Sequence, residues 1–156
     1  METEEKLKKL QVFYAAVLAD TTMHYGQAGI LEEVSEKKYQ EQLKTGLALA
    51  SRLGISEAKD VFEKTQEIYG CADWHLENTT EGFVAKCQNC LLCQISKQKS
   101  QFSPCEIFCL SPLKAMTLGL KPQAEFLVKQ TLFTKEACVV EVKLSGEEDE
   151  PSNTKG

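Results

Sequence analysis

The hydrophobic periodicity of this chain changes at Gly70. Before this residue, apolar side chains recur every three or four positions, which is the pattern of amphipathic helices. From Ala72 onward, apolar and polar residues alternate, as they do in strands with one buried face. A chain that presents helices first and short strands afterwards is typical of an α+β fold, in which helices cover one face of an antiparallel sheet.

The residues before Gly70 predict helices. A first helix ends near Gly26, and a last one begins at the cap Ser56 and ends at Gly70. Between them, residues 28–53 form either one long helix or two short ones, with Gly54 just past the end. The residues expected to face inward are Leu7, Leu10, Tyr14, Val17 and Thr21, then Ile30, Leu31, Val34, Leu43, Leu47 and Ala50, and finally Ala58, Val61, Phe62, Thr65 and Ile68.

Alternating residues predict two β-hairpins in the second half of the chain. The first hairpin joins residues 72–76 to residues 83–87 through a turn rich in Asn, Thr and Gly. The second joins residues 126–132 to residues 138–144. The two hairpins together supply the strands of an antiparallel sheet.

A short helical region is expected between the hairpins. Ser103-Pro104-Cys105-Glu106 has the form of a capping box with proline in the first helical position. Ser111-Pro112 repeats this start signal, so the helix is expected to kink or restart there. The predicted order is therefore helices, hairpin, helix, hairpin, in a single α+β domain over residues 1–145. The acidic residues 146–156 are expected to form a disordered tail.

Charge and composition narrow the classes of partner. The 156 residues suit one ordinary domain, and the net charge of −5 argues against a nucleic-acid phosphate backbone as the partner. No apolar run is long enough to span a bilayer, and the charged N-terminus lacks the apolar segment of a signal peptide. These features predict a cytoplasmic protein that does not bind membranes. The hairpin edges could pair across a homodimer.

Seven cysteines are the most unusual part of the composition. Cytoplasmic thiols are kept reduced, and an odd number cannot be fully paired in disulfides, so metal binding, catalysis and plain burial are the alternatives. Five of the cysteines fall between residues 87 and 109: Cys87, Cys90, Cys93, Cys105 and Cys109. The first three are spaced so that thiolates in a turn could point at one ion, and the last two share a helical face.

Two kinds of metal site fit this spacing. Zinc would take four thiolates, for example Cys90, Cys93, Cys105 and Cys109, in a closed structural site. An iron–sulfur cluster would take Cys87, Cys90 and Cys93 with a remote cysteine, although Lys97 stands where bacterial ferredoxins carry their fourth cysteine. Alternatively, the thiols simply pack as small apolar side chains.

Catalysis by a thiol has its own candidates. Cys105 falls in the first turn of the predicted central helix, where the helix dipole favours a thiolate. His75 lies on the polar side of its strand, where it either faces solvent or serves as an acid–base group. His24 in the last turn of the first helix is a weaker candidate, and Cys138, in phase with Val140, is expected in the core.

The chain resembles the L-2-amino-thiazoline-4-carboxylic acid hydrolase family over about residues 10–144. The resemblance is carried by Cys105-Glu-Ile-Phe-Cys109-Leu-Ser-Pro-Leu-Lys-Ala-Met-Thr-Leu-Gly-Leu, Gln130-Thr131-Leu132 and Cys138-Val-Val-Glu-Val, with Tyr25-Gly26 and Arg52-Leu53-Gly54-Ile55 in the helical front. The order of elements is also similar to that of vinyl-reductase-type small-ligand domains. In the family pattern, Cys87, Cys109 and Cys138 match family cysteines, whereas Cys90, Cys93 and Cys105 are additional.

The resemblance implies a hydrolase that opens a small cyclic amidine, converting a thiazoline to an N-carbamoyl cysteine. Cys109 or Cys105 would attack the ring carbon, or a metal-bound water would do so, and His75 would move the proton if the hairpin brings it within reach. Three classes of function therefore stay open: a hydrolase of a small molecule, a cysteine-ligated zinc or iron–sulfur module for redox chemistry or sensing, and a small-ligand-binding domain without catalysis.

Overall fold

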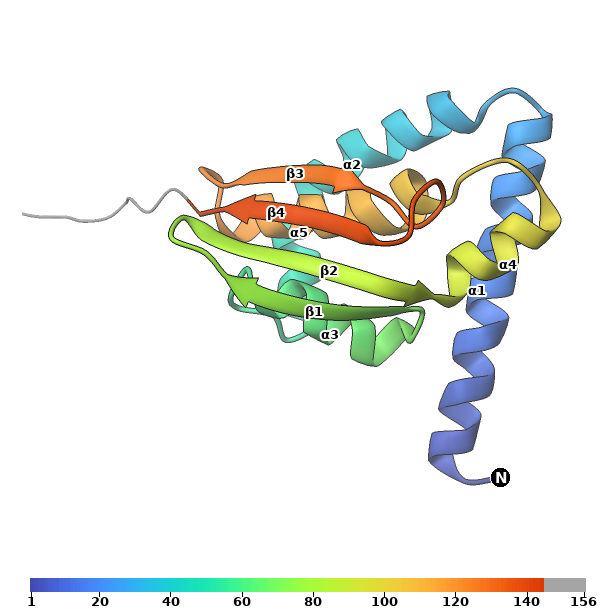
Figure 1. Cartoon of the computed structure of the whole chain (residues 1–156), viewed down its shortest axis with the longest axis horizontal. Helices are drawn as coiled ribbons and strands as arrows, with labels where there is room; N and C mark the ends of the chain where they lie inside the picture. The colour runs from blue at the N-terminus through green and yellow to red at the C-terminus, as the bar shows by residue number, and fades with distance from the viewer. Residues whose placement is uncertain (145–156) are drawn as a thin grey trace, which may run out of the picture.

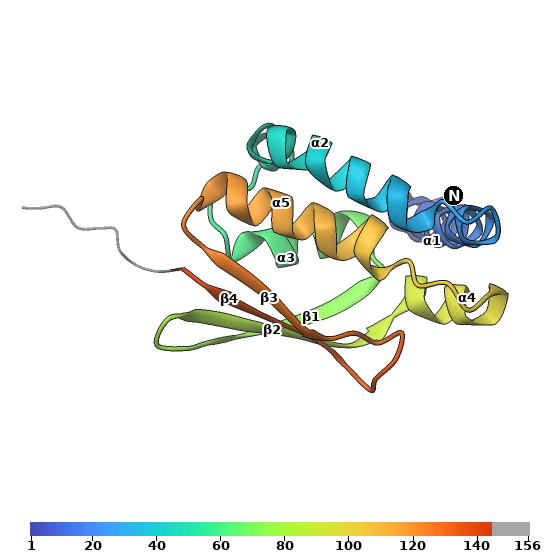
Figure 2. The ribbon, with the colours of Figure 1, turned by 90° about the horizontal axis from the view of Figure 1, so that it is seen from above.

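A computed structural model describes residues 1–144 of the chain. The elements are α1 (Thr3–Gln27), α2 (Leu31–Arg52), α3 (Asp60–Tyr69), β1 (Ala72–Asn78), β2 (Gly82–Cys90), α4 (Leu91–Lys99), the π-helical turn η1 (Glu106–Leu110), α5 (Ser111–Leu120), β3 (Glu125–Gln130) and β4 (Cys138–Lys143). The strands form one antiparallel sheet in the order β1-β2-β4-β3. Helices α2, α3 and α5 lie over one face of it (Figures 1 and 2), so the α+β prediction is confirmed. The predicted acidic tail lies outside the described residues.

The predicted hairpins are both present, and their buried residues form the core. Phe83, Ala85 and Cys87 of β2 are buried in alternation, as are Cys138, Val140 and Val142 of β4. The ring of Phe62 from α3 packs edge-on against Trp74 and Phe83 and stacks on Phe126, with centroid distances of 5.0, 5.8 and 6.1 Å. This aromatic cluster holds α3 against the sheet.

Glycine ends two of the helices as the sequence predicts. Gly54 and Gly70 have φ values of 74° and 65°, in the left-handed region that glycine adopts without strain. Gly26 has a different role: α1 continues to Gln27, and a Cβ at Gly26 would overlap the ring of Phe102. At this position the small residue permits a close contact instead of ending the helix.

The predicted inward face of α1 is wrong. Leu7, Leu10 and Val17 are exposed, whereas the small residues Ala15 and Ala19, together with Thr22, are buried. The reason is that α1 packs against α4, and close packing of helices favours small side chains in the contact. In Figure 1 the N-terminal half of α1 projects beyond the sheet, and Leu7 and Leu10 on this half are exposed.

The inward face of α2 is also partly wrong. The helix is continuous from Leu31 to Arg52, with Ile30, Leu43 and Leu47 exposed. Ala50 is buried as predicted, whereas Ser35 and Gly46 are buried in place of the exposed residues. Gly46 lies directly against the carbonyl of Ala115, so α2 and α5 approach each other too closely for a large side chain at this point.

The third helix begins later than predicted. Its N-cap is Lys59, and Ser56 lies in the preceding turn. Val61, Phe62 and Thr65 are buried as expected, but Ile68 is exposed near the end of the helix.

The cysteine segment contains a helix that the sequence patterns did not predict. Strand β2 ends at Cys90, and α4 begins at the next residue, Leu91, whose amide donates a 2.7 Å hydrogen bond to the carbonyl of Cys71. The predicted kink before Pro112 is a π-helical turn, in which the amide of Ser111 donates to the carbonyl of Glu106. Proline cannot donate a backbone hydrogen bond, which makes the regular α-helical pattern unfavourable there.

Candidate functional site: a pocket beside a cluster of thiols

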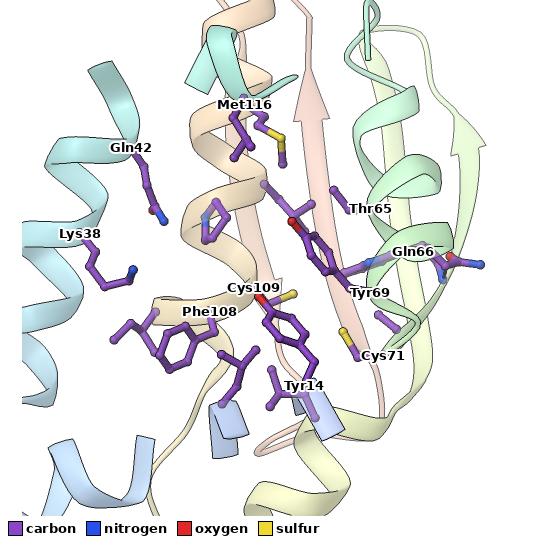
Figure 3. Close-up of a pocket in the computed structure, with 18 residues that line it drawn as sticks. Tyr14, Lys38, Gln42, Thr65, Gln66, Tyr69, Cys71, Phe108, Cys109 and Met116 are labelled. Carbon is purple, nitrogen blue, oxygen red and sulfur yellow. Dashed lines mark hydrogen bonds between the residues drawn. The ribbon is translucent and has the colours of Figure 1, made fainter. Parts of the chain in front are cut away.

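A pocket with a volume of about 240 Å³ lies between the helical layer and β1. Its walls come from every helix and from the π-helical turn, and Figure 3 shows side chains from these elements converging on it. Most of the lining is apolar, as in sites that bind small molecules. The apolar part consists of Leu18, Leu49, Ala72, Trp74, Leu92, Ile107, Phe108, Pro112, Leu113 and Met116.

Gln42 brings an unpaired polar atom to the pocket. Its side-chain oxygen is buried, and no donor within residues 1–144 bonds to it. By contrast, the side-chain oxygen of Gln66 accepts a 2.7 Å hydrogen bond from the amide of Trp74 and is fixed to the wall. Leaving a buried amide oxygen unpaired costs about 1–3 kcal/mol, so Gln42 marks a place where a ligand donor would be favourable.

Lys38 lies one helical turn before Gln42 on α2. Its ammonium group is 5.7 Å from the centroid of the Phe108 ring, and within residues 1–144 it forms no ion pair. Figure 3 shows the Lys38 and Gln42 side chains reaching from α2 toward the same pocket. A cation beside a buried amide can hold an anionic ligand group such as a carboxylate.

Two tyrosines form the opposite wall of the pocket. The rings of Tyr14 and Tyr69 stack with a centroid distance of 5.4 Å, which joins α1 to α3. Burial is the main cause that raises the pKa of Tyr14, followed by the neighbouring Tyr69 and Cys71. The Tyr14 phenol therefore keeps its proton and can donate a hydrogen bond to a ligand.

Two thiols reach the same pocket. Cys71 precedes β1, and Cys109 comes from the π-helical turn. Figure 3 shows both sulfur atoms beside the tyrosine rings. Burial raises the pKa of Cys109, and neighbouring cysteines, Cys90 first among them, raise it further. Cys109 is therefore a protonated thiol in the ligand-free protein.

The cysteines form a second, smaller site behind this pocket, which we call the thiol cavity. It is about 20 Å³ in volume and is lined by Ala72, Trp74, Cys87, Cys90, Leu92, Cys93, Cys105, Cys109, Leu110, Leu132 and Cys138. Strand pairing places Cys87 directly opposite Cys138. The fold therefore brings all five cysteines of the predicted segment together, with Cys138 from the last strand beside them.

Hydrogen bonds connect Cys71 and three thiols of this cavity in a row. The sulfurs of Cys93 and Cys105 are 3.5 Å apart, and Cys90 interacts with both Cys71 and Cys93. The bonds from Cys71 and Cys93 lower the pKa of Cys90, and the bond from Cys93 lowers the pKa of Cys105. Cys93, whose proton is shared with its neighbours, has a raised pKa.

The predicted metal site is not preformed in the described chain. Within residues 1–144, no group of three or more His, Cys, Asp or Glu side chains is arranged to hold a metal ion. Cys87, Cys90, Cys93, Cys105 and Cys109 surround one cavity without converging on a single point. Zinc or iron–sulfur binding stays a prediction.

The predicted histidines lie away from both cavities. His75 follows the buried Trp74 on β1, so it points to the opposite face of the sheet. Its imidazole is largely exposed and lies 3.4 Å from the carboxylate of Asp73. His24 is exposed on α1, 3.5 Å from Asp20. The first hairpin therefore does not bring His75 to Cys105 or Cys109.

The sequence patterns did not predict the polar groups of the pocket. Lys38 and Gln42 are four residues apart and share one side of a helix, but the same spacing occurs throughout the polar faces of amphipathic helices. Only the packing of α2 on α5 shows that this pair is turned inward. Tyr14 was expected to be apolar core, and it lines the pocket instead.

Comparisons with known proteins found no relative of this chain. No family model matches the chain, and no curated protein or solved structure is detectably similar to it. The resemblance to the thiazoline hydrolases stays a prediction. Among the helices of residues 1–144, none is both long and apolar enough to cross a membrane.

Proposed function

We propose that this protein binds a small organic carboxylic acid in the pocket between α1, α2, α3 and α5. The observation that carries the proposal is the buried, unpaired oxygen of Gln42 in a mostly apolar cavity of about 240 Å³. A ligand N–H or O–H group would satisfy this oxygen, and Lys38 would neutralise a carboxylate beside it. The volume limits the ligand to a compact molecule.

The aromatic side chains favour a flat ligand body. Tyr14, Tyr69 and Phe108 present ring surfaces to the pocket, and planar groups pack well against such surfaces. A small heterocycle that carries an N–H donor and a carboxylate combines these requirements. The compound that the family resemblance implies, 2-amino-thiazoline-4-carboxylate, has all of these features.

Calorimetric titration with 2-amino-thiazoline-4-carboxylate tests the proposal. We expect saturable binding, and weaker binding of the analogue 2-aminothiazoline, which lacks the carboxylate. Lys38→Met should lower the affinity for the acid by about tenfold, the loss expected when one charge-assisted contact of about 1.4 kcal/mol is removed.

Lys37 provides the matched control. It is adjacent to Lys38 but points to solvent and pairs with Glu33 at 3.1 Å. Lys37→Met changes the net charge equally, so it should leave the affinity unchanged. Equal loss of affinity in both variants would show that general charge attraction, rather than a specific contact, holds the acid.

Hydrolysis of such a ligand is a second candidate, favoured by the position of Cys109 in the pocket wall. The thiol of Cys109 would add to the ring carbon while its proton passes to the ring nitrogen. The ring sulfur would then leave as a thiol, and water would release the carbamoyl product from Cys109. The basic amidine accepts the first proton itself, so this route does not use His75.

Product analysis separates hydrolysis from binding alone. For the hydrolase, Cys109→Ala should abolish formation of N-carbamoyl cysteine while calorimetric binding of the thiazoline persists. Cys90 does not line the pocket, so Cys90→Ala is the control that should retain turnover. Binding by the wild-type protein without any product would leave the ligand-binding function and reject the hydrolase.

Metal content tests the third class of function. Protein purified without oxygen and carrying stoichiometric zinc, or showing the brown absorbance of an iron–sulfur cluster, would establish the thiol cavity as a metal site. Such a result would require the sulfur atoms to move together from the arrangement described above.

A further inference from the structure

Cys93 and Cys105 are two thiols in direct contact. Their sulfur atoms are 3.5 Å apart and both residues are buried. They come from different elements, because Cys93 lies in the first turn of α4 and Cys105 directly precedes the π-helical turn. A disulfide has a sulfur–sulfur distance of about 2.05 Å, so rotation of the two side chains would bring them to bonding distance.

The surroundings favour nucleophilic sulfur at Cys105. Its sulfur shares a hydrogen bond with the Cys93 sulfur, and the hydroxyl of Ser103 also bonds to the Cys105 sulfur. A hydrogen bond donated to a sulfur stabilises its thiolate form. The thiolate is the form that attacks peroxides, so Cys105 is the more reactive partner and Cys93 the neighbour that can complete a disulfide.

A small oxidant has space to meet this pair. Both thiols line the thiol cavity of about 20 Å³, and a space of that size holds about one water-sized molecule. Bulky disulfides such as oxidised glutathione could not enter it. The chemistry therefore fits hydrogen peroxide better than thiol–disulfide exchange.

We propose that Cys93 and Cys105 form a peroxide-sensitive dithiol that closes a reversible disulfide. The Cys105 thiolate attacks one oxygen of hydrogen peroxide, which gives a sulfenic acid and releases hydroxide. The Cys93 sulfur then attacks the sulfenic sulfur and displaces its oxygen, and the Cys93 proton leaves with that oxygen as water. In total, two thiols and one peroxide give one disulfide and two waters.

The disulfide would join two elements of the fold covalently. It would link α4 to the start of η1 and close the loop of residues 94–104 between them. Ile107, Phe108 and Cys109 follow directly in η1 and line the larger pocket. Oxidation at Cys105 would thus fix the segment that carries this part of the pocket wall. The disulfide itself does not depend on whether any ligand binds.

Peptide mapping of the whole protein tests the proposal. Reduced protein is treated with a small excess of hydrogen peroxide, free thiols are blocked with N-ethylmaleimide in denaturant, and trypsin is added after dilution. Cleavage after Lys86, Lys97, Lys99 and Lys114 places Cys93 and Cys105 on different peptides. We expect these two peptides, residues 87–97 and 100–114, to be joined through Cys93 and Cys105, and to separate again after dithiothreitol.

Serine variants identify the partners. Cys105→Ser should restore full alkylation of Cys93, and Cys93→Ser should leave Cys105 as a sulfenic acid that dimedone traps when the treated protein is unfolded in its presence. Cys138→Ser is the control, because Cys138 lines the same cavity and should leave the cross-link intact. Circular dichroism confirms that each variant is folded.

Three results would overturn the proposal. One is a disulfide between Cys90 and Cys93, which would remain within the single peptide 87–97. Another is oxidation that stops at sulfinic acid and is not reversed by dithiothreitol. The third is full alkylation of both cysteines in peroxide-treated wild-type protein.

Discussion

The buried oxygen of Gln42 lowers the stability of the ligand-free protein, and the same oxygen is proposed to bind the ligand. An unpaired buried amide costs stability, and a native fold retains such a group where it serves another purpose. The neighbouring wall of α5 is apolar, with Leu113 and Met116 in the pocket lining. An apolar side chain of similar size at position 42 would suit this wall better than glutamine does.

Gln42→Leu should therefore separate stability from binding. We expect the free energy of unfolding of the ligand-free variant to rise by about 1 kcal/mol, because a buried unsatisfied oxygen is removed. Affinity for the carboxylic acid should fall in the same variant. Urea unfolding and calorimetric titration measure the two effects. A variant that loses stability and keeps full affinity would show that Gln42 is a structural residue.

Cys138 gives the protein a specific dependence on pH. Burial, followed by the nearby Cys105 and Cys87, raises the pKa of Cys138 to about 12 from an ordinary value of 9.0. The folded chain thus holds this proton more tightly than the unfolded chain. The contribution of the Cys138 thiol to the free energy of unfolding is fully present below about pH 9 and is lost as the pH rises toward about 12.

Cys138→Ala removes this proton and tests that pH dependence. Between pH 9 and pH 11, the stability of the wild-type protein should fall more steeply than that of the variant. The difference is at most about 1.4 kcal/mol for each pH unit. Urea unfolding at several pH values measures both slopes. Parallel slopes would contradict the assignment.

The contact between α2 and α5 positions the polar side of the pocket. Gly46 of α2 lies against the backbone of Ala115, and Gly119 of α5 lies against the backbone of Leu47. These two close approaches set the rotation of α2 that turns Lys38 and Gln42 inward. A single added methyl group at Gly46 has no free space.

Gly46→Ala should lower the free energy of unfolding by about 1–3 kcal/mol, the usual cost of overpacking, despite the better helix propensity of alanine. Thr45→Ala, at an exposed neighbouring position, should change it by less than about 0.5 kcal/mol. Urea unfolding measures both variants. Equal stability of Gly46→Ala and the wild-type protein would mean that the two helices can separate without cost.

The elements differ in how well their sequence patterns predict them. Gly54 and Gly70 end helices because the backbone there needs a positive φ, and such local requirements are visible in the sequence. The strands were predicted because apolar and polar residues alternate along them, and burial follows this alternation in β2 and β4. Helix α4 was not predicted because it has only nine residues and begins directly after a strand. The spacing of the cysteines in this segment suggested a metal-binding turn instead.

The inward faces of α1 and α2 were predicted less well. The patterns assume that large apolar residues face the core, whereas these two helices are buried through Ala19 and Gly46 at close contacts with α4 and α5. Close approach depends on the partner helix, which the pattern of one helix does not contain. Similarly, the cysteine cluster could be located along the chain, but Cys138 joins it only through the pairing of β2 with β4.

At the scale of the whole molecule, the projecting half of α1 carries an exposed apolar surface. Leu10, Val12 and Phe13 have exposed fractions of 64%, 50% and 67%. Neighbouring exposed apolar residues of this kind commonly lie in protein–protein contacts. A homodimer was predicted from the hairpin edges, and α1 offers it a more apolar surface than the sheet does.

Phe13→Glu should therefore produce a monomer if the wild-type protein is a dimer through α1. Leu47→Glu is the control, because Leu47 is an exposed apolar residue on α2. Light scattering coupled to size-exclusion chromatography measures the mass of each variant. A dimer that persists in Phe13→Glu would exclude this surface of α1.

Trp74 offers the most direct measurement of the proposed function. It is the single tryptophan of the chain, it is buried, and it lines the pocket. Its fluorescence therefore reports on the pocket and on the adjoining thiol cavity, which Trp74 also lines. Titration with 2-amino-thiazoline-4-carboxylate should change the emission of Trp74 until saturation, with a higher midpoint in Lys38→Met and an unchanged one in Lys37→Met. Emission that stays constant while calorimetry detects binding would place the ligand elsewhere and contradict the account.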